Sequence, residues 1–126
     1  MGALALLALG GCKNVEGRWL GECGFEDPVY AYVGLVDLRV NDGKGTNVEA
    51  TVAFDMSDGR HFEGPLEGVR SDTYIELEGV LTEDGYGPYT FSMSGEVQDY
   101  ETIDGDCGFR IPNGTGMLQG DLLLER

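Results

Sequence analysis

Closely spaced carboxylates are the side chains whose arrangement comes nearest to known catalytic chemistry in this sequence. Glu76 and Glu78 are two positions apart, so an extended strand would place both on one face. Two carboxylates flanking a sugar bond are what glycoside hydrolysis requires. The same spacing is typical of any solvent-facing strand, and we favour that interpretation. His61, the only histidine, has Asp58 and Arg60 nearby but no serine or cysteine motif to supply a nucleophile, so we expect no enzymatic activity.

Two acidic, glycine-containing segments, residues 41–45 and 55–59, are similar to fragments of calcium-binding loops. Neither has the closing glutamate at the spacing of an EF-hand, and Lys44 adds an opposing charge to the first. One histidine and no CxxC pair do not make up a zinc-binding set. We expect both segments to be turns, and we expect the protein to bind no metal ion and no other cofactor.

Residues 1–11 carry no charge and no hydrogen-bonding side chain, and they lead into Leu9-Gly10-Gly11-Cys12. As a helix this segment would be about 16 Å long, the length of a signal-peptide core and too short to span a membrane. Leu9-Gly10-Gly11-Cys12 resembles the lipobox of bacterial lipoproteins. The resemblance implies that residues 1–11 are a signal peptide and that Cys12 becomes a lipidated N-terminus. Because no Lys or Arg precedes Lys13, we expect the charged start of the signal peptide to lie upstream of Met1.

The lipoprotein resemblance also implies a location in the bacterial cell envelope, anchored by lipid and facing the periplasm or the cell surface. An Asp after the lipidated cysteine is the family's signal for the inner membrane, so Lys13 favours the outer membrane. Residues 12–126 then form a single domain, which carries the whole net charge of −15. This charge repels nucleic acids, so we expect no nucleic-acid partner and a membrane contact made through the lipid anchor.

Assigning Cys12 to the lipid leaves Cys23 and Cys107 as an even pair. In an exported protein such a pair is expected to form a disulfide, which here would close a loop of about 85 residues. Two free thiols are the alternative.

Alternating apolar and polar residues predict an all-β chain. Eight strands are expected, around residues 17–23, 32–40, 48–56, 62–68, 73–79, 89–97, 101–106 (extending toward Phe109) and 116–124. The stretches of alternating polarity are separated by dipeptides that favour tight hairpin turns. These are Asp42-Gly43, Asp58-Gly59, Asp84-Gly85, Asp104-Gly105 and Asn113-Gly114. Most apolar faces also include a glycine, which permits the sharp coiling of a small closed barrel.

Short successive strands joined by tight turns favour an antiparallel up-and-down barrel of eight strands, because closure removes the sheet edges. Gly17-Arg18-Trp19 resembles the Gly-x-Trp motif of the lipocalin/calycin superfamily, which implies that Trp19 plugs one end of a lipocalin-like barrel. The size and the single disulfide are similar to those of small periplasmic metalloprotease inhibitors. A β-sandwich is the alternative fold, although Trp19 precedes both cysteines, whereas the tryptophan of an immunoglobulin domain lies between them.

An eight-stranded barrel is just wide enough to be filled by side chains or to hold one small ligand. Inward positions carry large aromatic residues that are either core packing or candidate ligand contacts: Trp19, Phe54, Phe62, Tyr89 and Phe91. Four tyrosines near strand ends are placed to rim a mouth: Tyr30, Tyr32, Tyr86 and Tyr100. We predict a non-catalytic binding or structural role, with a small apolar ligand or an envelope protein as partner. The alternative is a periplasmic protease inhibitor acting through residues 12–16 or 25–30.

Overall fold

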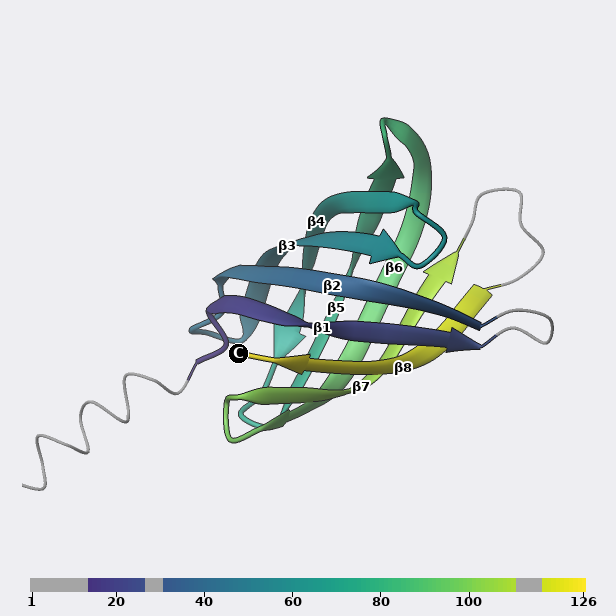
Figure 1. The fold of residues 1–126 in the computed structure, drawn as a ribbon. Coiled ribbons are helices and arrows are strands. Elements are labelled where there is room, and N and C mark those ends of the chain that lie inside the picture. Colours follow the sequence, from purple (N-terminus) through teal and green to yellow (C-terminus); the bar gives the residue numbers. More distant parts are fainter. Residues whose placement is uncertain (1–13, 27–30, 111–116) are drawn as a thin grey trace, which may run out of the picture.

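Eight antiparallel strands close into a barrel in the computed structural model, which describes residues 14–26, 31–110 and 117–126 (Figure 1). The strands are β1 (Gly17–Glu26), β2 (Ala31–Asp42), β3 (Asn47–Met56), β4 (His61–Arg70), β5 (Tyr74–Glu83), β6 (Tyr86–Gln98), β7 (Thr102–Arg110) and β8 (Met117–Glu125). Each strand pairs with the next, and β8 pairs with β1. The predicted up-and-down barrel is therefore confirmed, and the β-sandwich is excluded. Among the described residues, no helix is long and apolar enough to cross a membrane.

The strands alternate between buried apolar and exposed polar side chains, as the sequence predicts. In β3, for example, Val48, Val52 and Phe54 are buried, whereas Glu49 and Asp55 are exposed. In the described part of the chain, every side chain that is buried is apolar. Because each large apolar side chain contributes about 1.5–3 kcal/mol on full burial, this common interior supplies the main stabilisation of the barrel.

Three of the predicted turns join consecutive strands. Asp42 is the last residue of β2 and Gly43 the first of the turn after it, Asp58-Gly59 lies between β3 and β4, and Asp84-Gly85 joins β5 to β6. Both residues of Asp84-Gly85 have positive φ angles, 48° and 85°, as a tight hairpin of matching twist requires. Asn113-Gly114 lies outside the described residues.

The turn predicted at Asp104-Gly105 is wrong, because both residues lie within β7. Gly105 is paired with Gly95 of β6, and a side chain at position 105 would collide with the β6 backbone at Ser94. The absence of a side chain at Gly105 therefore allows β6 and β7 to approach each other closely. The turn before β7 is made by Asp99 and Tyr100, whose φ angles are 52° and 56°.

Trp19 closes the end of the barrel at which β1 begins. It is completely buried, and its indole N–H donates a hydrogen bond to the carbonyl of Val15 at 2.9 Å. The guanidinium of Arg126 lies over the indole ring, 4.4 Å from its centroid, in a cation–π contact. We call this the closed end; it also carries residues 43–46, 71–73 and 99–101, and Figure 1 shows both the start of β1 and the C-terminus there.

The disulfide predicted between Cys23 and Cys107 is present, and both cysteines are buried in the barrel. It links β1 to β7 across β8, since Cys23 is paired with Leu122 and Cys107 with Gly120 of that strand. The bridge joins positions 84 residues apart in the sequence and fastens the first strand to the last hairpin.

Candidate functional site

Six aromatic rings gather inside the end of the barrel opposite Trp19, which we call the far end. We name them the aromatic cluster: Phe25, Phe54, Phe62, Tyr89, Phe91 and Phe109. Phe109 is the hub, with ring centroids 4.8 Å from Phe62, 5.6 Å from Phe91 and 5.8 Å from Phe54. Most of these contacts are edge-to-face or tilted, the geometries that aromatic quadrupoles favour.

Antiparallel pairing brings these rings together from distant parts of the sequence. Phe25, Phe54 and Phe109 lie near the ends of β1, β3 and β7, whereas Phe62 and Tyr89 lie near the starts of β4 and β6. Strand ends and strand starts alternate around an up-and-down barrel, so all of these positions fall at one end.

Space inside the cluster is limited, even beside the glycines that face the interior of the barrel. A side chain at Gly34 would overlap the ring of Phe54, so that ring already occupies the volume that the glycine vacates. At Gly21, Gly79 and Gly120, the space is taken by the backbone of a neighbouring strand. These glycines therefore serve close packing, and a ligand among the rings must turn at least one of them aside.

Arg60, Glu83 and Tyr89 form a hydrogen-bonded group beside the cluster, which we call the polar rim. The Arg60 guanidinium donates two hydrogen bonds of 2.9 Å to the Glu83 carboxylate, and the Tyr89 hydroxyl donates a third at 3.2 Å. Arg60 also lies over the Phe62 ring, 4.9 Å from its centroid. The hydrogen bonds from Arg60 lower the pKa of Glu83 and those to Glu83 raise the pKa of Arg60, so both groups stay charged at neutral pH.

Four of the five aromatic residues predicted as ligand contacts are in this cluster, and Trp19 is not, because it lies at the closed end. Phe25 and Phe109 were missed, although each continues the alternation that puts Cys23 and Cys107 inside. Arg60 and Glu83 are 23 positions apart, and nothing in the sequence pairs them.

The tyrosines predicted to rim one mouth are divided between the two ends. Tyr86, 75% exposed, lies at the far end at the start of β6. Tyr100 lies at the closed end, where its hydroxyl donates to Asp72 at 3.2 Å, so the prediction of a shared rim is wrong for this residue. Tyr30 and the side chain of Tyr32 lie outside the described part of the structure.

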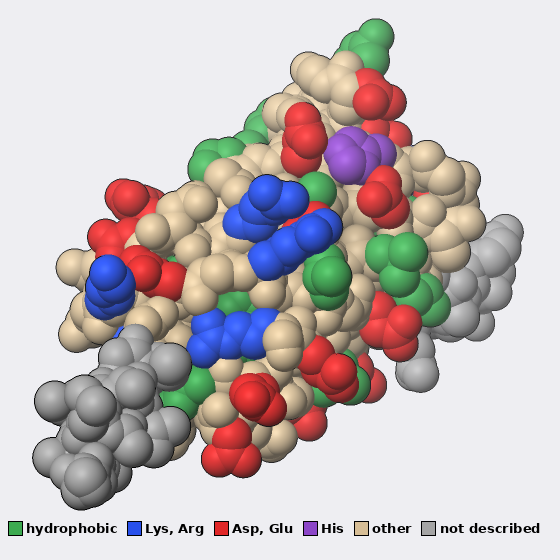
Figure 2. Space-filling view, turned by 60° about the vertical axis from the view of Figure 1, so that its left-hand side comes forward, with side chains coloured by type: hydrophobic (Ala, Val, Ile, Leu, Met, Phe, Trp, Pro, Cys, Tyr) green, Lys and Arg blue, Asp and Glu red, His purple; other side chains and the backbone are tan. Residues whose placement is uncertain are grey.

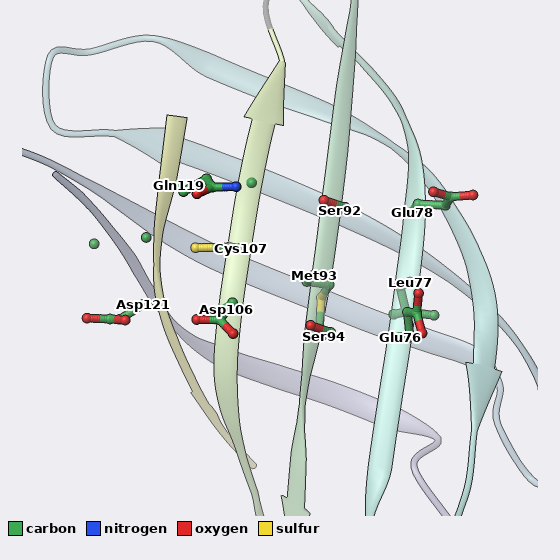
Figure 3. A pocket seen from close by; sticks show the side chains of 13 residues that line it. Glu76, Leu77, Glu78, Ser92, Met93, Ser94, Asp106, Cys107, Gln119 and Asp121 are labelled. Atoms are coloured by element: carbon green, nitrogen blue, oxygen red, sulfur yellow. The ribbon is translucent and has the colours of Figure 1, made fainter. Parts of the chain in front are cut away.

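Glu76 and Glu78 lie on the outer wall of the barrel, beside a hollow of about 600 Å³ (Figure 3). The hollow runs over β5, β6, β7 and β8, where small side chains such as Ser92 and Ser94 lie between carboxylates that include Asp106 and Asp121. It is open to solvent and separate from the aromatic cluster. Among the described residues, no group of His, Cys, Asp and Glu side chains is arranged to hold a metal ion.

His61 lies on the outer wall near the far end, between two carboxylates (Figure 2). Its Nδ1 is 2.6 Å from Asp55 across the β3–β4 pairing, and its Nε2 is 3.3 Å from Glu63 on its own strand. Hydrogen bonding to Asp55, and secondarily to Glu63, raises the pKa of His61 above its ordinary value of 6.5. The pairing therefore stabilises the fold fully below the unfolded pKa, and this contribution is lost as the pH rises through the folded pKa.

We expect an NMR titration of the His61 imidazole to give a midpoint above 6.5, and Asp55→Asn to lower it more than Glu63→Gln does. Glu67→Gln, which removes another exposed carboxylate from β4, is the matched control and should leave the midpoint unchanged. A midpoint that Asp55→Asn does not move would show that the ion pair is not populated in solution.

The sequence matches no protein-family model and no curated protein sequence. The fold is shared by solved structures, among them the following two. One is described as "Structure of EF1p2_mFAP2b bound to DFHBI", with a TM-score of 0.71 and 13% identity over 89% of this chain and 93% of that one. The other is "Structure of a redesigned beta barrel, mFAP1, bound to DFHBI", with a TM-score of 0.67 and 14% identity over 89% of this chain and 94% of that one. At these identities the likeness is one of fold.

Proposed function

We propose that this protein is a lipid-anchored, non-catalytic binding module of the bacterial envelope that holds a small apolar ligand at the far end of its barrel. The observation that carries the proposal is the aromatic cluster beside the polar rim, since small-molecule sites combine apolar walls with a few placed polar groups. Two barrels that share this fold were each solved with DFHBI bound, which supports a ligand role for the architecture.

Phe62 and Tyr89 are the rings that a ligand would have to part to reach Phe109, and they would then form its two walls. Their centroids are 5.1 Å apart, Phe62 lies under Arg60, and Tyr89 is only partly buried. A flat apolar molecule between these two rings and against Phe109 would keep the tilted and edge-to-face geometry of the cluster. A hydrogen-bonding group on that molecule would meet the Tyr89 hydroxyl and the Glu83–Arg60 pair.

Titration calorimetry with DFHBI and with 1-anilinonaphthalene-8-sulfonate tests this function. We expect saturable 1:1 binding of at least one of the two molecules, weakened about tenfold by Phe62→Leu and by Tyr89→Leu, because each variant removes one aromatic wall. Val97→Ala, a buried substitution in β6 near the closed end, is the control and should leave the affinity unchanged. Absence of saturable binding, or equal loss in all three variants, would refute a site at the far end.

The envelope anchor is tested separately, by the mass of the membrane-fraction protein. We expect loss of residues 1–11 and an acyl-modified Cys12, with two or three chains giving a stable attachment. Cys12→Ala should leave the protein unacylated and out of the washed membrane fraction. An unmodified Cys12 in the wild-type protein would rule out the anchor without affecting the ligand site.

The protease-inhibitor alternative requires an exposed segment at residues 12–16 or 25–30. Within residues 14–16, Val15 is completely buried, and the carbonyls of Asn14 and Glu16 accept hydrogen bonds from Arg126. A segment held in this way does not extend into a protease cleft. Phe25, the first residue of the other segment, is buried in the aromatic cluster, so we favour the binding module.

A further inference from the structure

We infer that the closed end of the barrel faces the bilayer at close range and the aromatic cluster points away from it, so that the ligand enters from the aqueous side. The inference rests on the proposed lipid anchor at Cys12. It adds an orientation, a lipid-facing surface and an entry side to that function.

The chain is fastened to the closed end from its first described residue. Arg126 donates hydrogen bonds to the carbonyls of Asn14 and Glu16 at 2.6 and 2.7 Å. Val15 is completely buried, and its amide donates to the carbonyl of Gly43 at 3.4 Å. The Glu16 carboxylate accepts from the Gly43 amide at 3.3 Å. These contacts tie residues 14–16 to the β2–β3 turn and to the C-terminus, so this segment is part of the barrel and adds no flexible tether.

The remaining link is short. Cys12 is two positions before Asn14, and two residues of fully extended chain span at most about 7 Å. A thioether-linked lipid holds its cysteine at the headgroup level. Asn14, at the closed end, must therefore lie within about 7 Å of that level, whatever the conformation of the link.

In the inferred orientation, with the barrel axis along the bilayer normal, the far end is well away from the bilayer. Strands of about ten residues rise about 33 Å along their own direction, or about 25 Å along the axis of a barrel with tilted strands. Phe62, Tyr89 and the polar rim are at that distance, which is beyond the headgroup region. A ligand that partitions into the bilayer would have to leave it before reaching them.

The distribution of cations agrees with this orientation. Of the seven Lys and Arg side chains in the described part of the chain, the five nearest the closed end are Arg18, Arg39, Lys44, Arg70 and Arg126. Figure 2, in which the closed end comes forward, shows Lys and Arg side chains over that part of the surface. Arg18 and Arg39 form ion pairs with Asp37, and Lys44 forms one with Glu16, so in a protein of net charge −15 these cations offset only a part of the repulsion from anionic headgroups.

Hydrogen exchange measured by mass spectrometry tests the orientation. The full-length lipoprotein, purified from membranes and reconstituted into phosphatidylethanolamine/phosphatidylglycerol vesicles, is compared with Cys12→Ala protein mixed with the same vesicles. We expect exchange at residues 43–46, 71–73 and 99–101 to slow at least threefold on anchoring, whereas residues 57–60 and 84–85 keep their rates. A twelve-residue Gly-Ser insertion between Lys13 and Asn14 should abolish the slower exchange at the closed end, because the longer, flexible link no longer holds the barrel close to the bilayer.

Three results would overturn the inference: slowing at the far end, no slowing anywhere, or slowing along the outer wall of β8, β1 and β2. That wall exposes Leu20, Leu35 and Leu123, so the last result would mean that the barrel lies on its side. If Cys12 carries no acyl mass, the anchor itself fails. The geometry is then tested on full-length protein coupled to a maleimide lipid, since the Cys23–Cys107 disulfide leaves Cys12 as the one free thiol.

Discussion

Replacing Cys23 and Cys107 together by alanine is expected to lower the free energy of unfolding by about 4.5 kcal/mol. The disulfide joins positions 84 residues apart, and the chain-entropy model assigns a loop of that length this much restriction of the unfolded state. Small domains have a total stability of about 5–15 kcal/mol, so the reduced barrel would be marginal. Urea unfolding monitored by Trp19 fluorescence measures the change.

Cys12→Ala is the matched control for this substitution, because it removes a cysteine and leaves the Cys23–Cys107 bridge intact. It should change the free energy of unfolding by less than about 0.5 kcal/mol. A loss below about 1 kcal/mol in the double variant would show that the bridge places little restriction on the unfolded chain.

Phe54→Ala is expected to cost about 4 kcal/mol of stability, the second large effect. The ring is completely buried and contacts Phe25, Phe91 and Phe109 at centroid distances of 5.4–5.8 Å. Its removal leaves a cavity in the middle of the aromatic cluster that tightly paired strands cannot close. Urea unfolding gives the free-energy change, and the near-ultraviolet circular dichroism of the cluster should weaken in parallel.

A double-mutant cycle with Gly34→Ala tests whether Phe54 occupies the space above that glycine. Gly34→Ala alone should cost about 2 kcal/mol, because the new methyl group overlaps the Phe54 ring. In the Phe54→Ala background the same change should cost at least about 1 kcal/mol less. Gly24→Ala, on a neighbouring strand with open space above the glycine, is the control and should be nearly neutral. Additive costs at positions 34 and 54 would contradict the packing described here.

The sequence by itself determined the strands, the interior face of each strand and the cysteine pair. Period-two alternation is a local property, so it could be followed residue by residue from Trp19 to Leu124. The same pattern predicted that the sheet closes into a barrel, because closure removes the exposed edges of a sheet of eight short strands joined by tight turns. It misassigned Asp104-Gly105, because a glycine required by a neighbouring backbone carries the same local signal as a glycine required by a turn.

Only the tertiary structure decided which side chains meet. Trp19 and Phe54 are equivalent inward aromatics in the sequence, yet antiparallel pairing places them at opposite ends of the barrel. The Arg60–Glu83 pair and the hub position of Phe109 likewise depend on strand register and on the order of strands around the closed sheet. Alternation shows only whether a residue points inward. Height along the barrel and position around it are set by long-range pairing, and they decide that the aromatic cluster lies at the end of the barrel opposite Trp19.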